Sequence, residues 1–402
     1  MGTFDKARRA GVRPGWLDPI RAAGVLLLAL SLAACSLGEL LPSQSGPVEP
    51  QLPQVSATAA KVALILPLTG AGETQRIGVA LKQAAELAMF DATNPDIELI
   101  TKDTGGSPQG AAAAASAALA EGADIILGPL LASEVQAVAG IAREGNVPVV
   151  AFSNISSVAG PGVYLLSFLL EEEVAQVVRH AVDNGGGRIA ALVPESPFGT
   201  TVERALATSA KASGARVIAV ERYAPTQQAL GDAAARIVEA AQDGSVNAVM
   251  IPDGGEALRQ AGAALTQAGF SAGQARVLGT GAWDDAQIGS VPIAVGGWYA
   301  GVPIELLRRF QQRYSQTYFS PPPRIASLAY DAVSLAIILA RDTSPERFSA
   351  AKFADAEGFQ GINGLFRFRP NGLVERGLAI LEVTPTGPRV VAPAPDRFGA
   401  GF

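Results

Sequence analysis

The sequence predicts an α/β fold whose folded part forms two lobes, each a parallel sheet covered by helices on both faces. Short apolar runs alternate with longer helical patterns, the runs are bounded by Gly and Pro, and the alternation occurs in two sets that divide near residues 164–168. Apolar runs of this length are typical of parallel strands buried on both faces. Strands that alternate with helices favour a doubly wound sheet with right-handed crossovers.

The expected strands are the apolar runs of the two lobes, followed by a pair of strands near the end of the chain. The first run, KVALILPL at 61–68, has its only charged residue at its start. The final pair is expected at 365–368 and 377–383, because the segment RPNG at 369–372 has the residues of a turn. The strands of the lobes are expected at 61–68, 97–102, 124–128, 148–152, 188–194, 215–223, 247–252 and 276–280.

The expected helices lie between these strands and are recognised by their apolar spacing and their end signals. In the first of them, Ile77 and Leu81 are four positions apart and share one helical face. The second begins with Ser107 as N-cap and Pro108 at its first position, and it ends before Gly122. Helices are expected at 73–90, 107–121, 132–144, 171–184, 198–213, 227–242, 256–268, 304–317, 323–340 and 345–354.

The first residues of the chain predict a signal peptide at 1–34. Basic residues precede an apolar run at 22–32, and the small residues Ala33 and Ala34 lead to Cys35. A basic region, a short apolar core and a small-residue cleavage site are typical of a secretory signal. The run has about half of the ~20 apolar residues that a membrane-spanning helix needs.

Cys35 is the only cysteine of the chain, so no disulfide can form within it. The sequence Leu-Ala-Ala-Cys resembles the lipobox of bacterial lipoproteins, which implies that a lipid is attached to Cys35 after cleavage. The alternative is an ordinary signal peptide followed by an incidental thiol, but an unpaired thiol in an exported protein calls for an explanation. We therefore expect a lipid-anchored protein on the periplasmic side of a bacterial membrane. Ser36 in place of Asp slightly favours the outer membrane.

The residues after the signal peptide predict a tether, and the last residues predict a flexible tail. The tether covers 35–60, which is rich in Pro, Ser, Gly and Gln and has no helical or strand period. The tail covers 384–402 and is Pro-rich. The folded part at 61–383 is long enough for two lobes.

Composition and charge exclude several classes of partner. The chain is 49% hydrophobic and 17% charged, with a formal net charge of −6 and a pI of about 5.1. An acidic protein is a poor partner for nucleic acid or anionic lipid, which are themselves polyanions. Contact with the membrane is therefore expected through the lipid anchor alone.

The sequence does not predict an enzyme. His180 is the only histidine, and it falls late in an expected helix. The chain has no G-x-S-x-G, no Walker A motif and no H-E-x-x-H, and Gly279-Thr280-Gly281 lacks the third glycine of a dinucleotide site. We expect no catalytic residue, no metal site and no cofactor.

A ligand is expected at the carboxyl ends of the strands, where loops turn into helices in open α/β sheets. Helix N-termini at this edge offer free N–H groups, which suit a carboxylate. Polar side chains here could donate hydrogen bonds and aromatic ones could make apolar contacts, although each could also merely cap a helix or close a turn. The candidate ligand-binding residues are Thr69, Gly70, Ser133, Ser153, Asn154, Phe198, Asp253, Gly254 and Trp283.

The order and spacing of several motifs resemble the type I periplasmic binding proteins, in their Leu/Ile/Val-binding branch. These motifs are KVALILPLTG at 61–70, ADIILGPLLASEVQAVAGIAREGNVPVVAFSN at 123–154, Phe198-Gly199, IPDGG at 251–255, SLAYDAV at 327–333 and FQGINGLFRFRPNG at 359–372. The resemblance implies two Rossmann-like lobes joined by three crossings near Ser167, Tyr299 and Glu357, with a ligand cleft between them. It assigns about 61–166 and 300–356 to lobe 1, and about 167–299 and 357–383 to lobe 2.

Within this branch the chain looks most similar to lipoproteins that activate penicillin-binding proteins, although the helical N-terminal domain of the enterobacterial activator is absent.

Two departures from the amino-acid binders bear on function. Ile155 stands where those binders have a hydroxyl residue that grips the carboxylate, and the loop at 279–283 has no acidic residue for the ammonium group. A buried ammonium without a carboxylate is poorly bound, unless Asp253 or Asp284 takes over.

Two functions therefore remain open. The departures favour a regulator of peptidoglycan synthesis that engages a peptidoglycan synthase, with a degenerate or regulatory pocket. The alternative is the substrate-binding component of an ABC transporter, which presents an amino acid or another small polar ligand, such as a cell-wall fragment, to an ABC permease.

Overall fold

The computed structural model describes residues 59–399, with the exception of 94, 243, 272 and 286. The expected signal peptide, the lipid attachment at Cys35 and the tether as far as 58 lie outside the described residues. Within the described part, no helix combines the length and the apolar character that a membrane crossing requires.

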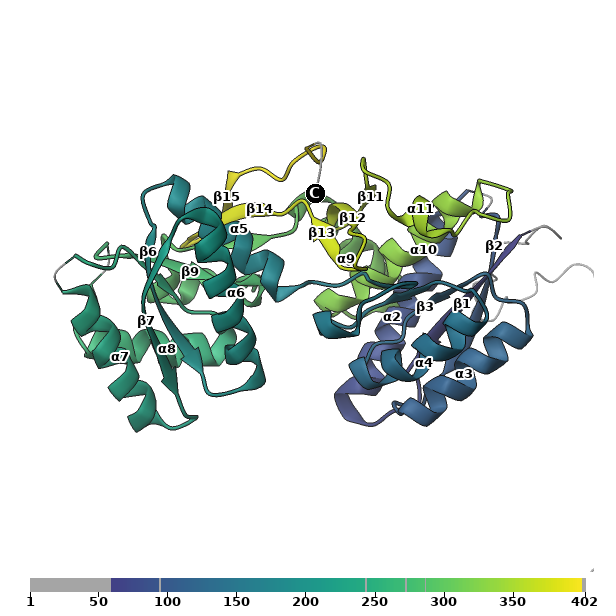
Figure 1. Ribbon diagram of the computed structural model, residues 1–402. Coiled ribbons are helices and arrows are strands. Elements are labelled where there is room, and N and C mark those ends of the chain that lie inside the picture. Colours follow the sequence, from purple (N-terminus) through teal and green to yellow (C-terminus); the bar gives the residue numbers. More distant parts are fainter. Residues whose placement is uncertain (1–58, 94, 243, 272, 286, 400–402) are drawn as a thin grey trace, which may run out of the picture. The chain divides into compact units, whose positions relative to one another are not determined.

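The first sheet, sheet A, is parallel throughout and has the order β2-β1-β3-β4-β5. Its longest pairing runs from Ala60 opposite Ile97 to Leu66 opposite Asp103. The strands are β1 (Ala60–Leu66), β2 (Ile97–Asp103), β3 (Ile125–Leu127), β4 (Val149–Ala151) and β5 (Val163–Leu165). The helices that connect them are α2 (Gly72–Asp91), α3 (Pro108–Ala120) and α4 (Ala132–Glu144) (Figure 1).

Alternate residues of β1 face two different apolar layers. Leu64 and Leu66 belong to a core cluster that includes residues of α2, whereas Ala63 and Ile65 belong to a cluster formed with α3 and α4. Side chains of a strand alternate between the two faces of its sheet, so both faces of sheet A are buried. This confirms the expected doubly wound arrangement.

The second sheet, sheet B, has the order β15-β14-β10-β9-β8-β6-β7. The strands β6 to β10 are parallel and repeat the order of sheet A, whereas β14 and β15 are antiparallel additions at one edge. The strands are β6 (Arg188–Pro194), β7 (Arg216–Tyr223), β8 (Ala248–Met250), β9 (Arg276–Gly279), β10 (Trp298–Gly301), β14 (Ala379–Thr384) and β15 (Gly387–Ala392). The helices around them are α5 (Leu170–Asp183), α6 (Pro197–Ser213), α7 (Gln227–Ala241) and α8 (Gly255–Gln267).

The strand β15 corrects the expectation of a flexible tail from 384 onward. Its residues Gly387 to Ala392 pair with β14, and Thr384 closes the connecting turn by donating a hydrogen bond to the carbonyl of Gly387 (2.7 Å). Pairing with β14 stabilises this segment, although the residues from 384 onward are rich in Pro and β15 itself is largely exposed. The strand is one of those cases in which tertiary contacts override local composition.

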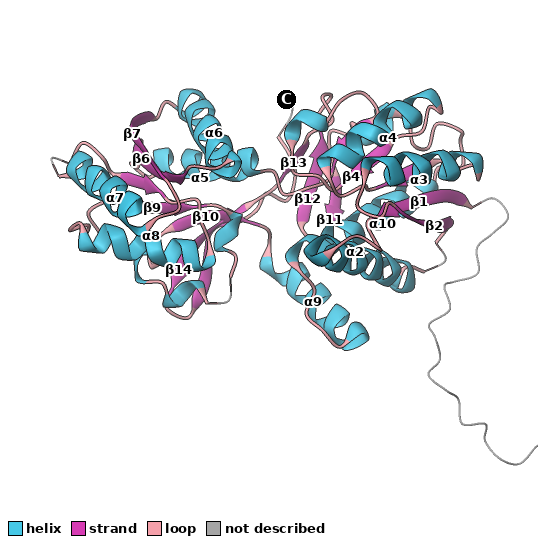
Figure 2. Cartoon of the chain, turned by 90° about the horizontal axis from the view of Figure 1, so that it is seen from below, coloured by secondary structure: helices cyan, strands magenta, loops and turns pink. Residues whose placement is uncertain are grey.

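The later part of the chain returns to sheet A. The helix α10 (Ser327–Ala340) packs against α2, and α9 (Ile304–Tyr318) lies beside α2 as well (Figure 2). The helix expected at 345–354 is reduced to α11 (Ala350–Phe353). Phe348 and Phe353 are both buried, and residues five apart lie about 140° apart around a helix, so a continuous helix would not bury both against one surface.

A third, antiparallel sheet, sheet C, consists of β11 (Phe359–Gly361), β12 (Gly364–Phe368) and β13 (Val374–Arg376). The turn expected at 369–372 connects β12 to β13, and Leu373 forms a β-bridge with Leu165 of sheet A. The range 357–383, expected from the sequence to belong to lobe 2, is thus divided between sheet C and β14 of sheet B. The chain passes from β13 to β14 at Gly377-Leu378 rather than near Glu357.

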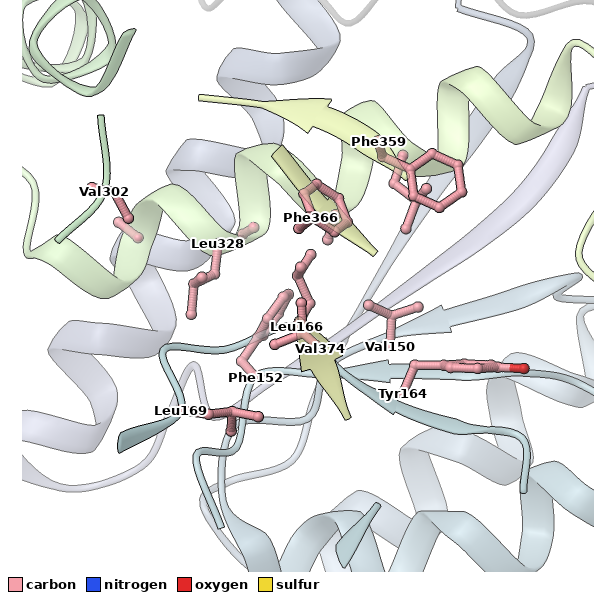
Figure 3. Close-up of a cluster of buried hydrophobic side chains, with 14 of the residues drawn as sticks. Val150, Phe152, Tyr164, Leu166, Leu169, Val302, Leu328, Phe359, Phe366 and Val374 are labelled. Carbon is pink, nitrogen blue, oxygen red and sulfur yellow. The ribbon is translucent and has the colours of Figure 1, made fainter. Parts of the chain in front are cut away.

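The core between sheet A and sheet C is aromatic (Figure 3). Tyr164 of β5 stacks on Phe353 of α11 with ring centroids 4.4 Å apart, and its ring centroid is 5.2 Å from that of Phe368 of β12. Phe152 and Phe366 belong to the same cluster. Aromatic burial of this kind fixes the end of β4, from which the residues of the candidate site extend.

Short 3₁₀ helices complete the described structure: η1 (Ser156–Val158), η2 (Gly281–Trp283), η3 (Ile288–Ser290), η4 (Pro292–Ala294) and η5 (Arg324–Ala326).

Candidate functional site

A cavity of about 600 Å³ lies at the carboxyl ends of the strands and is lined by residues from both sheets. On the side of sheet A it is bounded by the start of α2, the segment Leu130–Ala132 after β3 and the segment Phe152–Ile155 after β4. On the side of sheet B it is bounded by Phe198 of α6 and by Thr280 after β9.

Two other cavities, of about 690 and 620 Å³, lie at the opposite ends of the strands. The larger is lined by Asn247, which precedes β8, and by Arg276 at the start of β9; the smaller is lined by Asp124 and Pro148, which precede β3 and β4. Ligands of open α/β sheets bind outside the carboxyl ends of the strands. We therefore take the cavity of about 600 Å³ as the candidate functional site.

The loop after β3 reaches the cavity through a glycine. Gly128 has φ +92°, and a Cβ at this position would lie 2.2 Å from the carbonyl oxygen of Ile65 in β1. Only glycine adopts this conformation and permits this approach. The loop then leads to the first turn of α4, where Glu134 accepts hydrogen bonds from the Leu131 N–H (3.2 Å) and the Thr104 hydroxyl (2.5 Å). Burial raises the pKa of Glu134, and these hydrogen bonds oppose the rise.

Three of the residues expected to bind a ligand line this cavity, namely Ser153, Asn154 and Phe198. Ser153 is buried, and its hydroxyl oxygen accepts a hydrogen bond from the N–H of Ile155 (3.3 Å). Phe198 keeps 38% of its surface exposed although it is a large apolar residue. Ser133 follows the lining residue Ala132 but is itself exposed and is not among the lining residues.

Thr69 and Gly70 do not line the cavity; they belong to a turn that positions α2. The Thr69 hydroxyl donates to the carboxylate of Asp103 at the end of β2 (2.5 Å), and the N–H groups of Leu68 and Thr69 donate to the same carboxylate. Burial raises the pKa of Asp103, but the hydrogen bonds outweigh this effect and hold it below its ordinary value. The turn brings Glu73 at the start of α2 to the cavity.

Asp253, Gly254 and Trp283 support the cavity from behind and do not line it. Trp283 is fully buried and donates from Nε1 to the carbonyl of Asp253 (2.9 Å), while the hydroxyl of Tyr223 donates to the Asp253 carboxylate (2.8 Å). Burial raises the pKa of Asp253. A Cβ on Gly254 would lie 2.2 Å from the carbonyl oxygen of Ala282, which does line the cavity.

The cavity also contains an ion pair, Arg324 and Glu173, that was not expected from the sequence. The guanidinium group of Arg324 donates to Glu173 (3.3 Å) and to the carbonyl of Gly281 (3.1 Å), and the N–H of Gly281 donates to Glu173 (2.9 Å). The two side chains are 151 positions apart in the sequence. Arg324 also lies over the ring of Phe168, 4.1 Å from its centroid.

Glu173 lies in the acidic first turn of α5, and it is buried. It shares the buried face of α5 with Val174, Val177 and Ala181. Its spacing of one, four and eight positions from these apolar residues is that of a helical face, so the pattern did contain a signal. No comparable signal marks Arg324, because its role depends on contacts made by distant segments.

A second arginine lies directly behind Phe168. Arg376 of β13 is buried, its Nε donates to the carbonyl of Ser167 (2.9 Å), and its guanidinium carbon is 5.1 Å from the Phe168 ring centroid. Burial lowers the pKa of Arg376 to about 10, and nearby Asp331 opposes this effect. Burial raises the pKa of Asp331, whose carboxylate accepts hydrogen bonds from Ile362 and Asn363. These contacts tie α10 to sheet C beneath the cavity.

The groups that line the cavity are hydroxyls, an amide, apolar side chains and one ion pair. The described residues contain no group of three or more His, Cys, Asp or Glu side chains placed to hold a metal ion. His180 packs against Trp298 with ring centroids 4.7 Å apart and is not a lining residue. Hydroxyl and amide groups, exposed apolar side chains and one ion pair can hold and orient a small molecule.

Comparisons with known proteins agree with this arrangement. A family model described as periplasmic binding protein matches residues 59–388. Among curated proteins, no relative matches the chain. A structure from Rhodospirillum rubrum, assigned to branched-chain amino acid ABC transport, has a TM-score of 0.72 at 20% identity and covers 83% of this chain and 100% of its own.

Two further solved structures have the same fold at a similarly low sequence identity. A leucine-, isoleucine-, valine-, threonine- and alanine-binding protein from Brucella ovis has a TM-score of 0.60 at 19% identity, covering 81% of this chain and 90% of its own. A solute-binding protein of an ABC transporter from R. palustris, in complex with benzoate, has a TM-score of 0.57 at 18% identity, covering 84% of this chain and 97% of its own.

Proposed function

This chain belongs to the periplasmic binding protein family, and we propose that it is the solute-binding component of an ABC transporter. The observation that carries the proposal is the cavity of about 600 Å³ at the carboxyl ends of the strands, lined from both sheets. Small-molecule sites are clefts of about 300–1,000 Å³ with apolar walls and a few polar groups. Membership of the family also favours a location outside the cytoplasm and a role in binding without catalysis.

The ligand is a small solute held between the two sheets. Ser153 and Asn154 offer polar groups from the side of sheet A, and Phe198 offers an apolar surface from the side of sheet B. Structural relatives bear the names of proteins that bind aliphatic amino acids or that hold benzoate. Both kinds of solute combine a carboxylate with an apolar body, which agrees with this mixed lining.

The sequence favoured a regulator of peptidoglycan synthesis, with transport as the alternative. Two of the structural relatives are named as ABC transporter proteins and a third as an amino-acid-binding protein. The cavity has the size and the lining of a solute site. These observations support transport better than an interaction with a peptidoglycan synthase, so the order of the two functions is reversed.

The lipid on Cys35 forms part of the proposal, because it would keep the binding protein at a membrane surface. Labelling cells with a clickable palmitate analogue tests it. We expect label on the wild-type chain and on a Ser36→Ala control, and none on Cys35→Ala. Label retained by Cys35→Ala would contradict the lipid anchor.

Thermal unfolding of the full chain in the presence of candidate solutes tests the transport function. The panel contains amino acids, aromatic and branched carboxylates, and muropeptides. A ligand present at a hundred times its Kd stabilises the folded state by about 2.7 kcal/mol, so a cognate solute should raise the Tm by several degrees. The Phe198→Ala variant should lose most of this shift and keep the Tm of the free protein, because Phe198 is partly exposed.

A pull-down of bifunctional penicillin-binding proteins from a membrane extract completes the test. We expect no synthase to be retained by the full chain. Capture of a synthase together with no shift by any solute would reject transport in favour of cell-wall regulation.

A further inference from the structure

The charged side chains that line the cavity already have partners. Among the described lining residues, the charged ones are Glu73, Glu173 and Arg324. Glu73 lies at the exposed start of α2 and pairs with Arg76. Glu173 is buried and pairs with Arg324 while it also accepts the N–H of Gly281. Of the two lining carboxylates, the buried one is therefore already paired, and the exposed, hydrated Glu73 offers little to an ammonium group buried in the cavity.

This arrangement disfavours a ligand that carries an ammonium group. An ammonium ion entering the cavity needs a carboxylate, because an unpaired buried charge is strongly unfavourable. Glu173 could serve only by giving up Arg324, whose guanidinium group would then lose its own counter-ion. Asp284 is 3.8 Å from the Nε of Arg324, so this second acid faces the same guanidinium group.

Arg324, in contrast, has hydrogen-bonding capacity to spare. A guanidinium group has five N–H donors, and Arg324 makes hydrogen bonds only to Gly281 and Glu173 within the described residues. Its Nε is buried and faces Asp284, so the spare donors are the remaining N–H groups of Nη1 and Nη2. The side chain as a whole is 26% exposed. The planar arginine fork matches the geometry of a carboxylate.

The rest of the lining is apolar and partly aromatic, beside the uncharged polar residues Thr74, Ser153, Asn154, Ser167 and Thr280. Phe168 lies beneath the guanidinium group of Arg324, with the two 4.1 Å apart. Phe152 and Phe198 line the same cavity, and Ile155 leaves 49% of its surface exposed there. Exposed apolar side chains in a cavity are stabilised by an apolar ligand that covers them.

We propose that the cavity selects organic acids with an apolar, preferably aromatic, body and no ammonium group, and that Arg324 is the residue that determines this specificity. The inference rests on the proposed solute-binding function and names its ligand class. Glu173 holds Arg324 in place through Gly281 and shares the guanidinium group with the ligand carboxylate. The same Glu173 carboxylate excludes amino acids, because it is not free to receive their ammonium group.

Matched compounds that differ by one group test the ligand class by isothermal titration of the full chain. The probes are 3-phenylpropionate, L-phenylalanine, which adds the ammonium group, and 3-phenylpropanamide, which removes the charge. A second pair consists of 4-methylpentanoate and L-leucine. Each acid is expected to bind at least about tenfold more tightly than its amino acid and than the amide, which corresponds to ~1.4 kcal/mol.

Substitutions at the ion pair test the role of Arg324. Arg324→Gln should weaken binding of 3-phenylpropionate by about tenfold or more and leave the weak binding of the amide unchanged. Glu173→Gln should tighten binding of the acid, because the guanidinium group loses its competing anion. Arg308→Gln is the control; this arginine lies on α9, with its side chain 67% exposed and outside the cavity. Arg324→Lys keeps the charge and serves as a second variant should Arg324→Gln fold poorly.

The possible failures of the inference and of the proposed function differ. Tighter binding of L-phenylalanine or L-leucine than of the matching acid would overturn the inference and leave solute binding intact. Unchanged affinity for the acid in both Arg324→Gln and Arg324→Lys would overturn the role of Arg324. If no solute of the wider panel shifts the Tm, the proposed function fails together with the inference.

Discussion

Gly281 shows how a single residue organises the candidate site. Both of its backbone polar groups are held by the ion pair, since its N–H donates to Glu173 and its carbonyl accepts from Arg324. A Cβ at this position would lie 2.2 Å from a carboxylate oxygen of Glu173 and 2.6 Å from Nη1 of Arg324. The close contact of charged side chains with the backbone therefore requires a glycine.

Replacing Gly281 with Ala should disturb the ion pair and destabilise the fold. We expect Gly281→Ala to lower the free energy of unfolding by about 1–3 kcal/mol, measured in urea, because the new methyl group separates buried polar partners. Gly140→Ala is the control, because Gly140 is exposed in the middle of α4 and a Cβ there would meet no neighbouring atom within 4 Å. That change should stabilise the chain by about 0.4–1 kcal/mol. Equal effects of the two changes would contradict the proposed crowding at Gly281.

His180 gives a second test at the scale of one residue. Burial lowers its pKa, the carboxylate of Asp183 opposes the effect, and Arg276 adds to it. A depressed pKa in the folded state means that the unfolded chain takes up a proton first. Stability is therefore lost as the pH falls from about 6.5 through the pKa of the folded state.

The imidazole signal of His180 in an NMR titration should give a pKa below about 6.5, with no ambiguity of assignment, since the chain has one histidine. His180→Gln should remove the corresponding slope of the unfolding free energy with pH. A titration midpoint above about 6.5 in the folded protein would be inconsistent with the burial of this side chain against Trp298.

At the scale of elements, the ends of strands β7, β8 and β9 are held together by partly buried hydrogen bonds. Tyr223 at the end of β7 donates to Asp253 after β8, and Trp283 after β9 donates to the carbonyl of Asp253. Tyr299 of β10 is also fully buried, but its hydroxyl has no hydrogen-bond partner within the described residues. The hydroxyl of Tyr223 thus has a hydrogen-bond partner, whereas the hydroxyl of Tyr299 has none among the described residues.

Removing each hydroxyl should have opposite effects. Tyr223→Phe leaves the partly buried Asp253 carboxylate without its donor, so we expect the unfolding free energy to fall by about 1–3 kcal/mol. Tyr299→Phe removes an unpartnered buried hydroxyl, so it should be neutral or stabilising by up to about 1 kcal/mol. Chemical denaturation of both variants measures the difference. A loss of stability in Tyr299→Phe as large as that in Tyr223→Phe would mean that its hydroxyl has a partner.

The elements that can be predicted well from the sequence are those whose signal is local. The runs that become β1 and β6 are apolar over most of their length, and Ser107-Pro108 marks the start of α3 as expected. The strand β15 was missed because Pro388 lies within it and Pro393 follows it, and because it is stabilised by pairing with β14. Sheet C was only partly anticipated, since its strands are short and pair among themselves.

The candidate site was predictable to the extent that it follows from strand ends. Ser153, Asn154 and Phe198 follow predicted strands and do line the cavity. Trp283 and Asp253 also follow strands, but their side chains turn inward to hold the loops together. Position along a strand fixes which edge of the sheet a residue occupies; it does not fix whether the side chain points to solvent or into the core.

At the scale of the whole molecule, one apolar core connects the two sheets. Leu64 of β1, Val174 of α5, Ile189 of β6 and Ile380 of β14 all belong to it, while separate clusters lie under α3 and α4 and under α7 and α8. A shared core couples the unfolding of the elements that contribute to it.

We expect a single unfolding transition for the folded part of the chain. Differential scanning calorimetry should give a calorimetric enthalpy equal to the van't Hoff enthalpy, because the lobes lose their common core together. As a control, the transition seen in the fluorescence of Trp283 and Trp298 should coincide with the transition seen in far-ultraviolet circular dichroism of the whole chain. Trp298 lies in sheet B and Trp283 beside it. Two resolved heat-absorption peaks would show instead that each sheet unfolds with its own helices.

The late position of β14 and β15 imposes an order on how the molecule is assembled as the chain emerges. The strands of sheet A lie within residues 60–165, so they can pair before most of the chain has been made. In sheet B, β10 is complete at Gly301, but its antiparallel neighbour begins only at Ala379. Until then β10 presents an unpaired edge of N–H and carbonyl groups, which is the kind of surface that recruits foreign strands. The growing chain thus passes through an interval of exposure to aggregation, which ends only when its last strands have joined the sheet.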